Sequence, residues 1–411
     1  MDETKLKTIL EQLTDSNGRK FVKDEKDVFL SNYSMWHRDE GEQLIKKFVR
    51  ILNGGSDESF SWLDILKYSN IKGESEVFNS ILKNKKRNIN MHYQIPEQFH
   101  GNIDNALLFH CMENPKGYVK DTEMDKWVKT EKNPTIVAYY NKSEEKRTGS
   151  NSNGVLVILK KRHKYVEKKE NLEETENLEE FIKNIIYSDE SELQRELTHM
   201  FKPNNFDFTE KYILKPKKNS KRKVLGYYYL ASYYSQLLQR DKFDLYKYNI
   251  EIDNANEKNR ERSLEIAKCI CNIEAYPFSC WDPKLGEDGI GRKIIMNSDI
   301  SHFGVFVVLR RVYRYLIEKR KSKEESKEEP KKPIFIFRKY KRVWEPLFNK
   351  IKGCEEIIDY LEENFFYCQL SQQGGGVTSN NVCSIAKYKQ FEKDKESAFG
   401  EIVELFNDNR I

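Results

Sequence analysis

The chain has 411 residues, of which 33% are charged and 38% hydrophobic, and its 71 lysines and arginines against 66 aspartates and glutamates leave a net charge of only +5. This near balance excludes a polycation that coats nucleic acid through its overall charge, so any nucleic-acid site has to come from local clusters. The 23 tyrosines, 23 phenylalanines and 5 tryptophans supply enough apolar area for a core, which argues against a disordered chain.

Neither a membrane span nor a secretory signal is visible in the sequence. No apolar run approaches the roughly 18 to 20 residues that a membrane helix needs, and the segment Met1–Lys5 is charged. The seven cysteines are odd in number and scattered, which is typical of reduced, buried thiols. Cys269 and Cys271 lack the two-residue gap of a zinc pair. We therefore expect a cytoplasmic protein with no membrane contact, metal or cofactor.

Residues 1–92 have the pattern of a helical N-terminal region. Apolar side chains recur at helical spacing from Leu44 to Leu52, and Asn53–Ser56 is rich in residues that end helices. Residues 141–224 differ, because they are rich in lysine and glutamate and have the composition of a charged insertion. Within it, Val155–Leu159 is a candidate hairpin strand and Lys215–Lys223 a candidate basic patch.

Four short apolar runs in the remaining residues, 93–140 and 225–411, have the composition of buried strands. They are Asn105–Met112, Cys269–Tyr276, Pro333–Phe337 and Phe365–Leu370. Helical segments separate them; the clearest is His302–Glu318, which is followed by a charged segment, Lys319–Lys332, predicted to be a solvated linker. This alternation predicts an α/β three-layer sandwich with a four-stranded, mainly parallel sheet, plus the helical N-terminal extension and the charged insertion.

Polar residues follow each predicted strand, at the edge where ligands of parallel sheets gather. The candidates are Glu113, Asn114, Pro115 and Tyr118 after the first strand, Tyr276 and Phe278 after the second, Arg338, Lys339 and Arg342 after the third, and Ser371, Gln372, Gln373, Ser379 and Asn380 after the fourth. Taken singly, each segment is also typical of an ordinary strand-terminating turn. Their convergence on one edge is what favours a site.

These residue types fit chemistry on an extruded base. An asparagine amide can orient a water beside a scissile bond, and Glu113 is a candidate general base. Aromatic rings such as Tyr276 and Phe278 can stack on a base. Glycine-rich loops and arginines hold phosphates, although the basic cluster after the third strand is equally typical of a solvated helix start. His110 lies inside the first strand and is predicted to be a satisfied core residue.

The string Pro96-x-x-Phe99-x-Gly101, followed by an apolar strand that ends in Asn114-Pro115, resembles the uracil-DNA glycosylase superfamily. It is most similar to the branch whose first motif is Gly-x-Asn-Pro-Gly and to uncharacterised bacterial proteins of that fold. The resemblance implies a four-stranded parallel sheet between helices. It also implies that Asn114 positions the attacking water, Pro115 shapes the loop and Tyr118 walls the base pocket, while residues 371–381 contact DNA as the base is flipped.

The chain departs from the family pattern at several positions. Met112 and Lys116 stand where the first motif has glycines, and Gln372–Gly376 stands where the second motif has a His-Pro-Ser or Asn-Pro-Ser core. No histidine follows His302. The histidine of the family's second motif thus has no counterpart, and without its imidazole an oxocarbenium-like sugar and a departing base anion are less well stabilised.

Three hypotheses follow from these residues. The first is a DNA glycosylase, a hydrolase of DNA repair that cleaves the N-glycosidic bond of an extruded uracil or modified base. The alternative is a non-catalytic nucleic-acid or nucleotide sensor or interaction protein on the same fold, with phage defence as one setting. Both have DNA or a nucleotide as partner, and the N-terminal helices or the insertion are expected to serve a protein partner. The third is a structural interaction protein with no nucleic-acid role, which the near-neutral charge favours.

Overall fold

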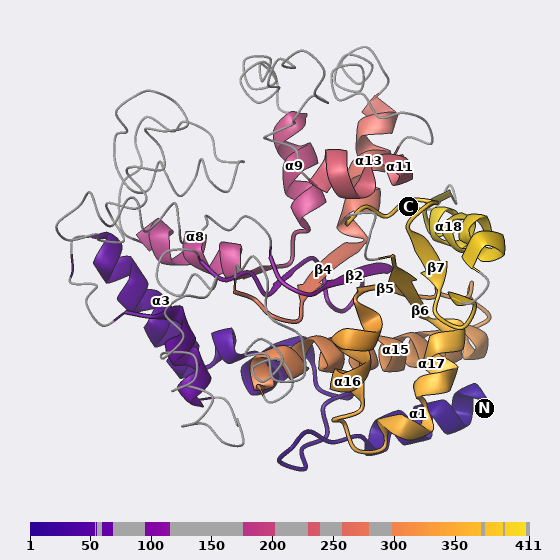
Figure 1. Cartoon of the computed structure of the whole chain (residues 1–411), viewed down its shortest axis with the longest axis horizontal. Coiled ribbons are helices and arrows are strands. Elements are labelled where there is room, and N and C mark those ends of the chain that lie inside the picture. Colours follow the sequence, from indigo (N-terminus) through magenta and orange to yellow (C-terminus); the bar gives the residue numbers. More distant parts are fainter. Residues whose placement is uncertain are drawn as a thin grey trace.

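A seven-stranded sheet lies at the centre of the computed structural model, which describes residues 1–53, 55, 60–68, 95–115, 176–201, 229–238, 257–278, 298–370, 375–388 and 391–407 (Figure 1). The strand order is β3-β1-β4-β2-β5-β6-β7. The strands are β1 (Phe99–His100), β2 (Leu108–Met112), β3 (Tyr187–Ser188), β4 (Ile270–Glu274), β5 (Ile334–Arg338), β6 (Phe366–Gln369) and β7 (Val382–Ser384).

The α/β class predicted from the sequence is confirmed, while the predicted number of strands is too low. The four apolar runs form β2, β4, β5 and β6, and these strands are neighbours that pair in parallel. The structure adds β1, which is antiparallel to β4, β3, which is parallel to β1, and β7, which is antiparallel to β6. Strands of two or three residues are too short to leave a period-two pattern in the sequence.

Successive residues of the central strands face two different hydrophobic clusters. Phe109 and Cys111 of β2 belong to the larger cluster, and Leu108 and Met112 belong to the smaller one. Both faces of the sheet are therefore buried, which is why these strands read as continuous apolar runs. We call the side of the larger cluster the first face and the other side the second face.

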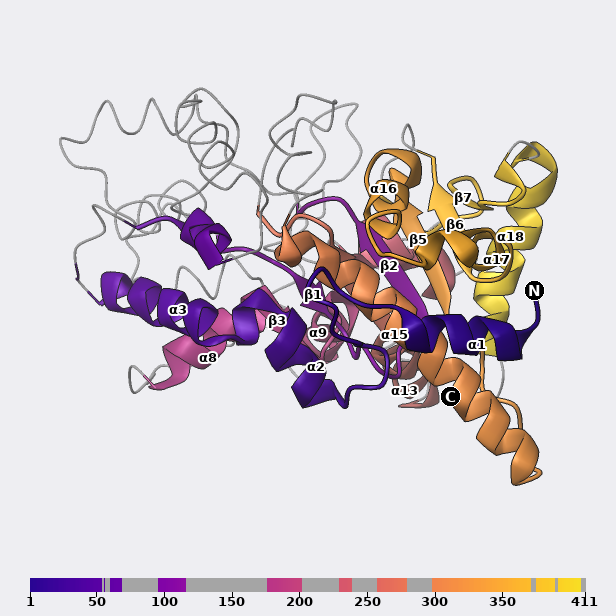
Figure 2. The ribbon, with the colours of Figure 1, turned by 90° about the horizontal axis from the view of Figure 1, so that it is seen from below.

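Helices cover both faces (Figures 1 and 2). On the first face lie α1 (Glu3–Gln12), α2 (Lys26–Tyr33), α15 (Asp299–Glu324), α16 (Trp344–Phe348) and α17 (Ile358–Asn364). On the second face lie α9 (Glu192–Met200), the π-helical turn η3 (Leu230–Tyr234), α11 (Ser235–Leu238), α13 (Glu257–Lys268) and α18 (Phe391–Asn407). None of the helices in the described ranges is long and apolar enough to cross a membrane.

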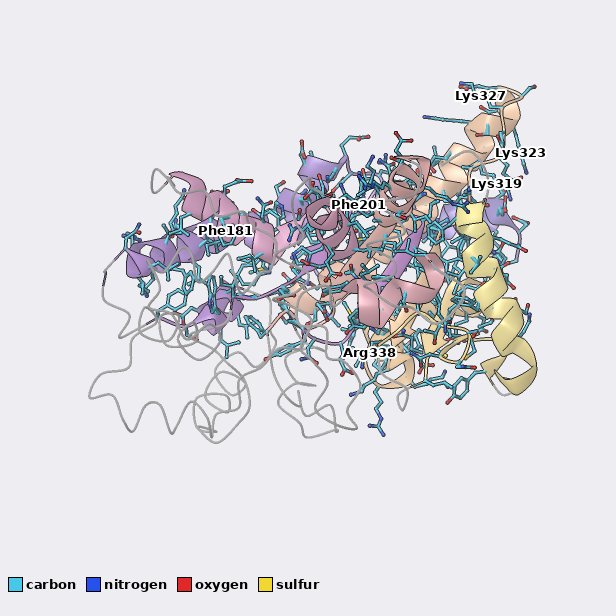
Figure 3. The ribbon with its side chains drawn as sticks, turned by 90° about the horizontal axis from the view of Figure 1, so that it is seen from above. Phe181, Phe201, Lys319, Lys323, Lys327 and Arg338 are labelled. Carbon is cyan, nitrogen blue, oxygen red and sulfur yellow. The ribbon has the colours of Figure 1, made fainter. Side chains whose placement is uncertain are left out.

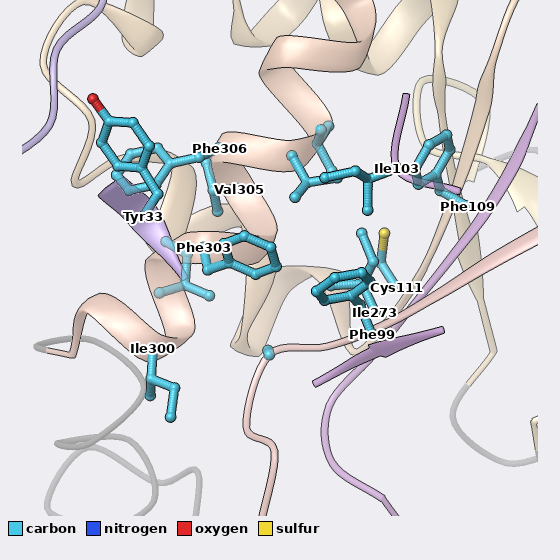
Figure 4. Packing of buried hydrophobic residues seen from close by; sticks show 14 of the residues in the cluster. Tyr33, Phe99, Ile103, Phe109, Cys111, Ile273, Ile300, Phe303, Val305 and Phe306 are labelled. Atoms are coloured by element: carbon cyan, nitrogen blue, oxygen red, sulfur yellow. The ribbon is translucent and has the colours of Figure 1, made fainter. Parts of the chain in front are cut away.

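Aromatic rings dominate the packing of the first face. Phe303 of α15 lies with its ring centroid 5.5 Å from that of Phe99, and Phe306 lies 5.3 Å from Tyr33 (Figure 4). The N-terminal helices α1 and α2 contribute Leu6 and Phe29 to the same cluster as the strands. The first helices of the predicted N-terminal region therefore share one core with the sheet.

The rest of the N-terminal region extends this core. The helix α3 (Asp39–Leu52) ends where the sequence predicts, at Asn53. It packs against α8 (Glu176–Ile186), and short 3-10 turns, η1 (Met35–His37) and η2 (Trp62–Tyr68), lie beside it. The described part of the predicted insertion thus supplies α8, the edge strand β3 and α9. Val155–Leu159 and Lys215–Lys223 lie outside the described residues.

The long helix α15 begins earlier and ends later than the predicted helix, His302–Glu318. Ser298 is its N-cap, and the Ser298 Oγ accepts a hydrogen bond from the amide of Ile300. The helix continues to Glu324, into the segment that the sequence predicts to be a linker. Lysine and glutamate are good helix formers, and pairs such as Arg320–Glu324 add support four residues apart.

Candidate functional site

The order of the four parallel strands places a topological switch point between β2 and β5. From β2 the chain crosses to β4 on one side, and from β5 it proceeds to β6 on the other side. The segments that leave β2 and β5 therefore diverge at the carboxyl edge of the sheet. In open α/β sheets this divergence is where a ligand crevice forms.

An ion pair joins the two segments at this point. Glu113 directly follows β2 and is 3% exposed, and its Oε2 lies 2.9 Å from the Nζ of Lys339, which directly follows β5. Lys339 has a left-handed backbone with a φ of 51°, which ends the strand and turns the chain into the 3-10 turn η4 (Tyr340–Arg342). The Glu113 carboxylate can act as a base only after it exchanges this lysine for another partner.

Asn114 and Pro115 follow Glu113 at the same edge of the sheet and are buried. Asn114 is 3% exposed, and its Nδ2 donates a hydrogen bond to the carbonyl oxygen of Pro115 at 3.0 Å. The predicted water-positioning amide is therefore packed away from solvent and engaged by its neighbour. It would have to leave this hydrogen bond before it could hold a water.

Tyr276 and Phe278, predicted to stack on a base, lie inside the first-face core. They are 0% and 1% exposed, and their ring centroids are 5.2 Å apart. Phe278 also meets Trp36 at 6.4 Å. A base could reach either ring only by displacing these neighbours.

Arg338, labelled in Figure 3, ends β5, and its place in the alternation after Ile336 puts its side chain on the second face. It is 7% exposed, and within the described part of the chain no hydrogen bond or ion pair joins its guanidinium to another residue. The neighbouring lysines do have acidic partners, because Lys339 pairs with Glu113 and Lys341 pairs with Glu345 at 2.6 Å. Arg342 is exposed. Because no counter-charge among the described residues occupies the guanidinium, its N–H groups are available to an anion that reaches this edge.

The aromatic residues interleaved with these basic residues belong to the core. Tyr340 and Trp344 are 4% and 0% exposed, and both rings pack on Phe337. Basic and aromatic residues alternate in the sequence after β5, but in the structure the aromatic side chains lie inside and the basic ones lie outside.

A buried polar network lies behind Arg338 on the second face. His110, at the middle of β2, has its Nε2 3.0 Å from the Oε1 of Gln369 and its Nδ1 3.1 Å from the hydroxyl of Tyr234. The Nδ2 of Asn272 donates to the same hydroxyl at 2.6 Å. The prediction that His110 is a satisfied core residue is confirmed. Burial, opposed by the Gln369 hydrogen bond and aided by the charge of Arg338, lowers the pKa of His110 to about 4.

The network reaches the segment that follows β6. Gln369 Nε2 donates to the carbonyl oxygens of Gly375 and Gly376 at 2.9 and 3.0 Å. Gly375 has no room for a side chain, because a Cβ there would lie 1.9 Å from Cε1 of Tyr233. The amide of Val377 also donates to the carbonyl oxygen of Tyr233, at 2.7 Å. This part of the chain is therefore held against η3.

The remaining predicted residues fall into two groups. The amide of Ser379 donates to Gln236 at 3.1 Å, and Asn380 beside it is exposed. Tyr118, Ser371, Gln372 and Gln373 lie outside the described residues. Sequence reasoning missed Tyr234, Asn272 and Gln369, although the last two carry a readable signal, since each is a polar residue within an otherwise apolar strand.

Among the residues that the structure describes, no group of three or more histidines, cysteines, aspartates or glutamates could hold a metal ion. The six cysteines in this part of the chain are free thiols.

No family model, curated protein or solved structure matches the chain. A function is therefore inferred from the residues and their arrangement.

Proposed function

We propose that this protein binds nucleic acid across the carboxyl edge of the β4-β2-β5-β6 sheet, with Arg338 as the innermost phosphate-binding residue. The observation that carries the proposal is Arg338 itself, a residue that is 7% exposed, lies beside the topological switch point and has no acidic partner among the described residues. Its planar fork suits a phosphate better than a point charge does, because two N–H groups can bind two oxygens at once.

The neighbours of Arg338 extend the same chemistry outward. Arg342 is exposed one 3-10 turn further along, and Asn380 is exposed beyond the adjacent strand β6. These side chains can contact further phosphates or sugars along a strand, and such contacts position a nucleic acid without reading its sequence. A small basic cluster also agrees with the net charge of +5, which leaves no long-range attraction over the whole surface.

Hydrolysis of an N-glycosidic bond is the second candidate function. It is favoured by one observation, the buried carboxylate of Glu113 next to Asn114 at the switch point. For this reaction Glu113 has to release Lys339, and Asn114 has to release the carbonyl of Pro115. The substrate would be DNA with an extruded uracil or modified base, and binding would have to drive both changes.

The binding proposal is tested by fluorescence anisotropy with labelled single-stranded and duplex DNA. Arg338→Gln is compared with Arg320→Gln, since Arg320 is an exposed arginine near the far end of α15, away from the carboxyl edge (Figure 2). We expect Arg338→Gln to weaken binding about ten-fold and Arg320→Gln to leave it unchanged. Equal effects of the two variants, or no binding by the wild type, would contradict the proposal.

The catalytic candidate is tested by incubating the protein with DNA that contains uracil, thymine mismatches or phage-type modified bases and then scoring abasic sites. Glu113→Gln and Asn114→Ala should abolish cleavage and leave DNA affinity within about two-fold, because neither is proposed to hold phosphate. DNA binding without abasic sites on any of these substrates leaves the protein as a binding protein and removes the hydrolase.

A further inference from the structure

We infer that His110 is a positioning residue that sets the segment 375–381 through a hydrogen-bond chain with one fixed direction. The chain runs from Asn272 through Tyr234, His110 and Gln369 to the main chain of Gly375 and Gly376. It crosses the sheet from β4 to the segment beyond β6. Only its consequence for DNA binding rests on the proposed function.

The direction of the chain is anchored at the glycine end. The carbonyl oxygens of Gly375 and Gly376 can only accept hydrogen bonds, so the amide nitrogen of Gln369 must face them. The other end of this amide, Oε1, then faces the Nε2 of His110. An oxygen can only accept, so the imidazole carries its proton on Nε2.

The rest of the chain follows from this tautomer. A neutral imidazole protonated on Nε2 has a bare Nδ1, and this atom accepts the hydroxyl proton of Tyr234. The phenol oxygen is then left to accept from the Nδ2 of Asn272. The Oδ1 of Asn272 has no hydrogen-bond partner among the described residues, which makes it the start of the chain. Every group in the chain therefore has a single assignment of donor and acceptor that satisfies its neighbours.

The segment at the end of the chain is closely fitted to its neighbours. Gly375 lies against the ring of Tyr233, where a Cβ would clash, and Asn381 donates through Nδ2 to the same Gly376 carbonyl at 2.7 Å. The segment carries Ser379 and Asn380, two of the residues proposed to contact DNA. Gln369 therefore helps to hold the segment that carries these residues, and its orientation and the histidine tautomer are compatible with each other in only one combination.

Nitrogen-15 NMR of histidine-labelled full-length protein tests the tautomer directly, with no ligand and no variant. We expect His110 to be neutral at pH 7 with a proton on Nε2 and a bare Nδ1. A proton on Nδ1 would reverse the chain, place the carbonyl of Gln369 against two other carbonyls and overturn the inference.

Hydrogen exchange of the segment 375–381 tests the positioning role. His110→Gln retains an Nε2 donor for Gln369, whereas His110→Phe removes it and keeps a ring of similar size. We expect the amides of this segment to exchange roughly ten-fold faster in His110→Phe and near the wild-type rate in His110→Gln. Equal exchange in both variants would mean that His110 only fills space.

A third variant covers the case in which His110→Phe fails to fold. Gln369→Met keeps the volume of the side chain and removes both donors to the glycine carbonyls, so it should also speed exchange in 375–381 and weaken DNA binding. Unchanged exchange would overturn the inference. If the wild type binds no DNA, the proposed function fails, while the exchange rates still decide whether the network positions this segment.

Discussion

The two faces of the sheet are built from the same strands and differ in the residues they bury. The first face carries Phe335, Phe337 and Phe366 side by side, and aromatic rings from α15 and α16 complete it. The second face mixes aliphatic residues with His110 and Asn272 in the same strands. The difference teaches that one face supplies stability through apolar area, while the other carries polar groups from the middle of the strands to their carboxyl ends.

Polar residues on the second face are tolerated because nearly all of them are paired. Buried polar groups cost free energy unless they form hydrogen bonds, and His110, Gln369 and Tyr234 satisfy one another. The guanidinium of Arg338 has neither a hydrogen bond nor an ion pair among the described residues of this face, and the Oδ1 of Asn272 is a second group there without a hydrogen bond. The proposed phosphate site rests on this cation without a partner at the edge of a paired network.

The largest expected effect breaks the first face. Phe337 is 0% exposed and its ring packs on Tyr340, Trp344, Phe348 and Phe366. Phe337→Ala should lower the free energy of unfolding by about 3 to 5 kcal/mol, because it removes apolar contacts and leaves a cavity. Urea denaturation measures this loss. A loss below about 1 kcal/mol would show that this face does not carry the stability.

The second face should make stability depend on pH through His110. Its folded pKa of about 4 lies below its ordinary value of 6.5, so the unfolded chain binds the proton more readily. The stabilising contribution is fully present above pH 6.5 and is lost as the pH falls through 4, by an amount on the order of 3 kcal/mol. Denaturation curves of wild type and His110→Gln from pH 7 to pH 4 measure it. Parallel pH profiles would contradict the prediction.

Replacing either partner of the ion pair at the switch point should lower stability by a different amount. Glu113 is 3% exposed, whereas the side chain of Lys339 is 30% exposed. Lys339→Met leaves a buried carboxylate without its cation and should cost about 2 kcal/mol, while Glu113→Gln leaves a lysine that can turn to water and should cost less. Thermal unfolding of the two variants decides this. A larger loss for Glu113→Gln would reverse the burial argument.

The smallest expected change in stability has the opposite sign. Arg338→Met replaces a largely enclosed arginine that has no partner among the described residues with an apolar side chain, so the free energy of unfolding should stay level or rise by about 1 kcal/mol. Arg320→Met serves as an exposed control. A clear loss of stability in Arg338→Met would mean that the guanidinium has a structural role in the free protein.

Sequence reasoning found the central strands because both faces of each one are buried, which leaves apolar runs such as Ile334–Phe337. It missed β1, β3 and β7, whose two or three residues are placed by pairing with distant strands. It also ended α15 too early, because a run of lysine and glutamate fits a solvated linker and a solvated helix equally well.

The candidate site divides in the same way. Glu113, Asn114 and Arg338 were identifiable because they follow apolar runs, and the parallel strands bring them to one edge. That Tyr276 and Phe278 point into the core, and that His110 reaches Gln369 across β5, depends on register and on the side of the sheet that each residue faces. These properties arise only when strands far apart in the sequence pair.

The salt dependence of DNA binding tests the central claim most directly. If the Arg338 guanidinium binds a phosphate, the slope of log K against log salt should be about one unit shallower in Arg338→Gln than in the wild type, and the slope of Arg320→Gln should equal that of the wild type. An Arg338→Gln slope equal to the wild-type slope would contradict a phosphate at this residue.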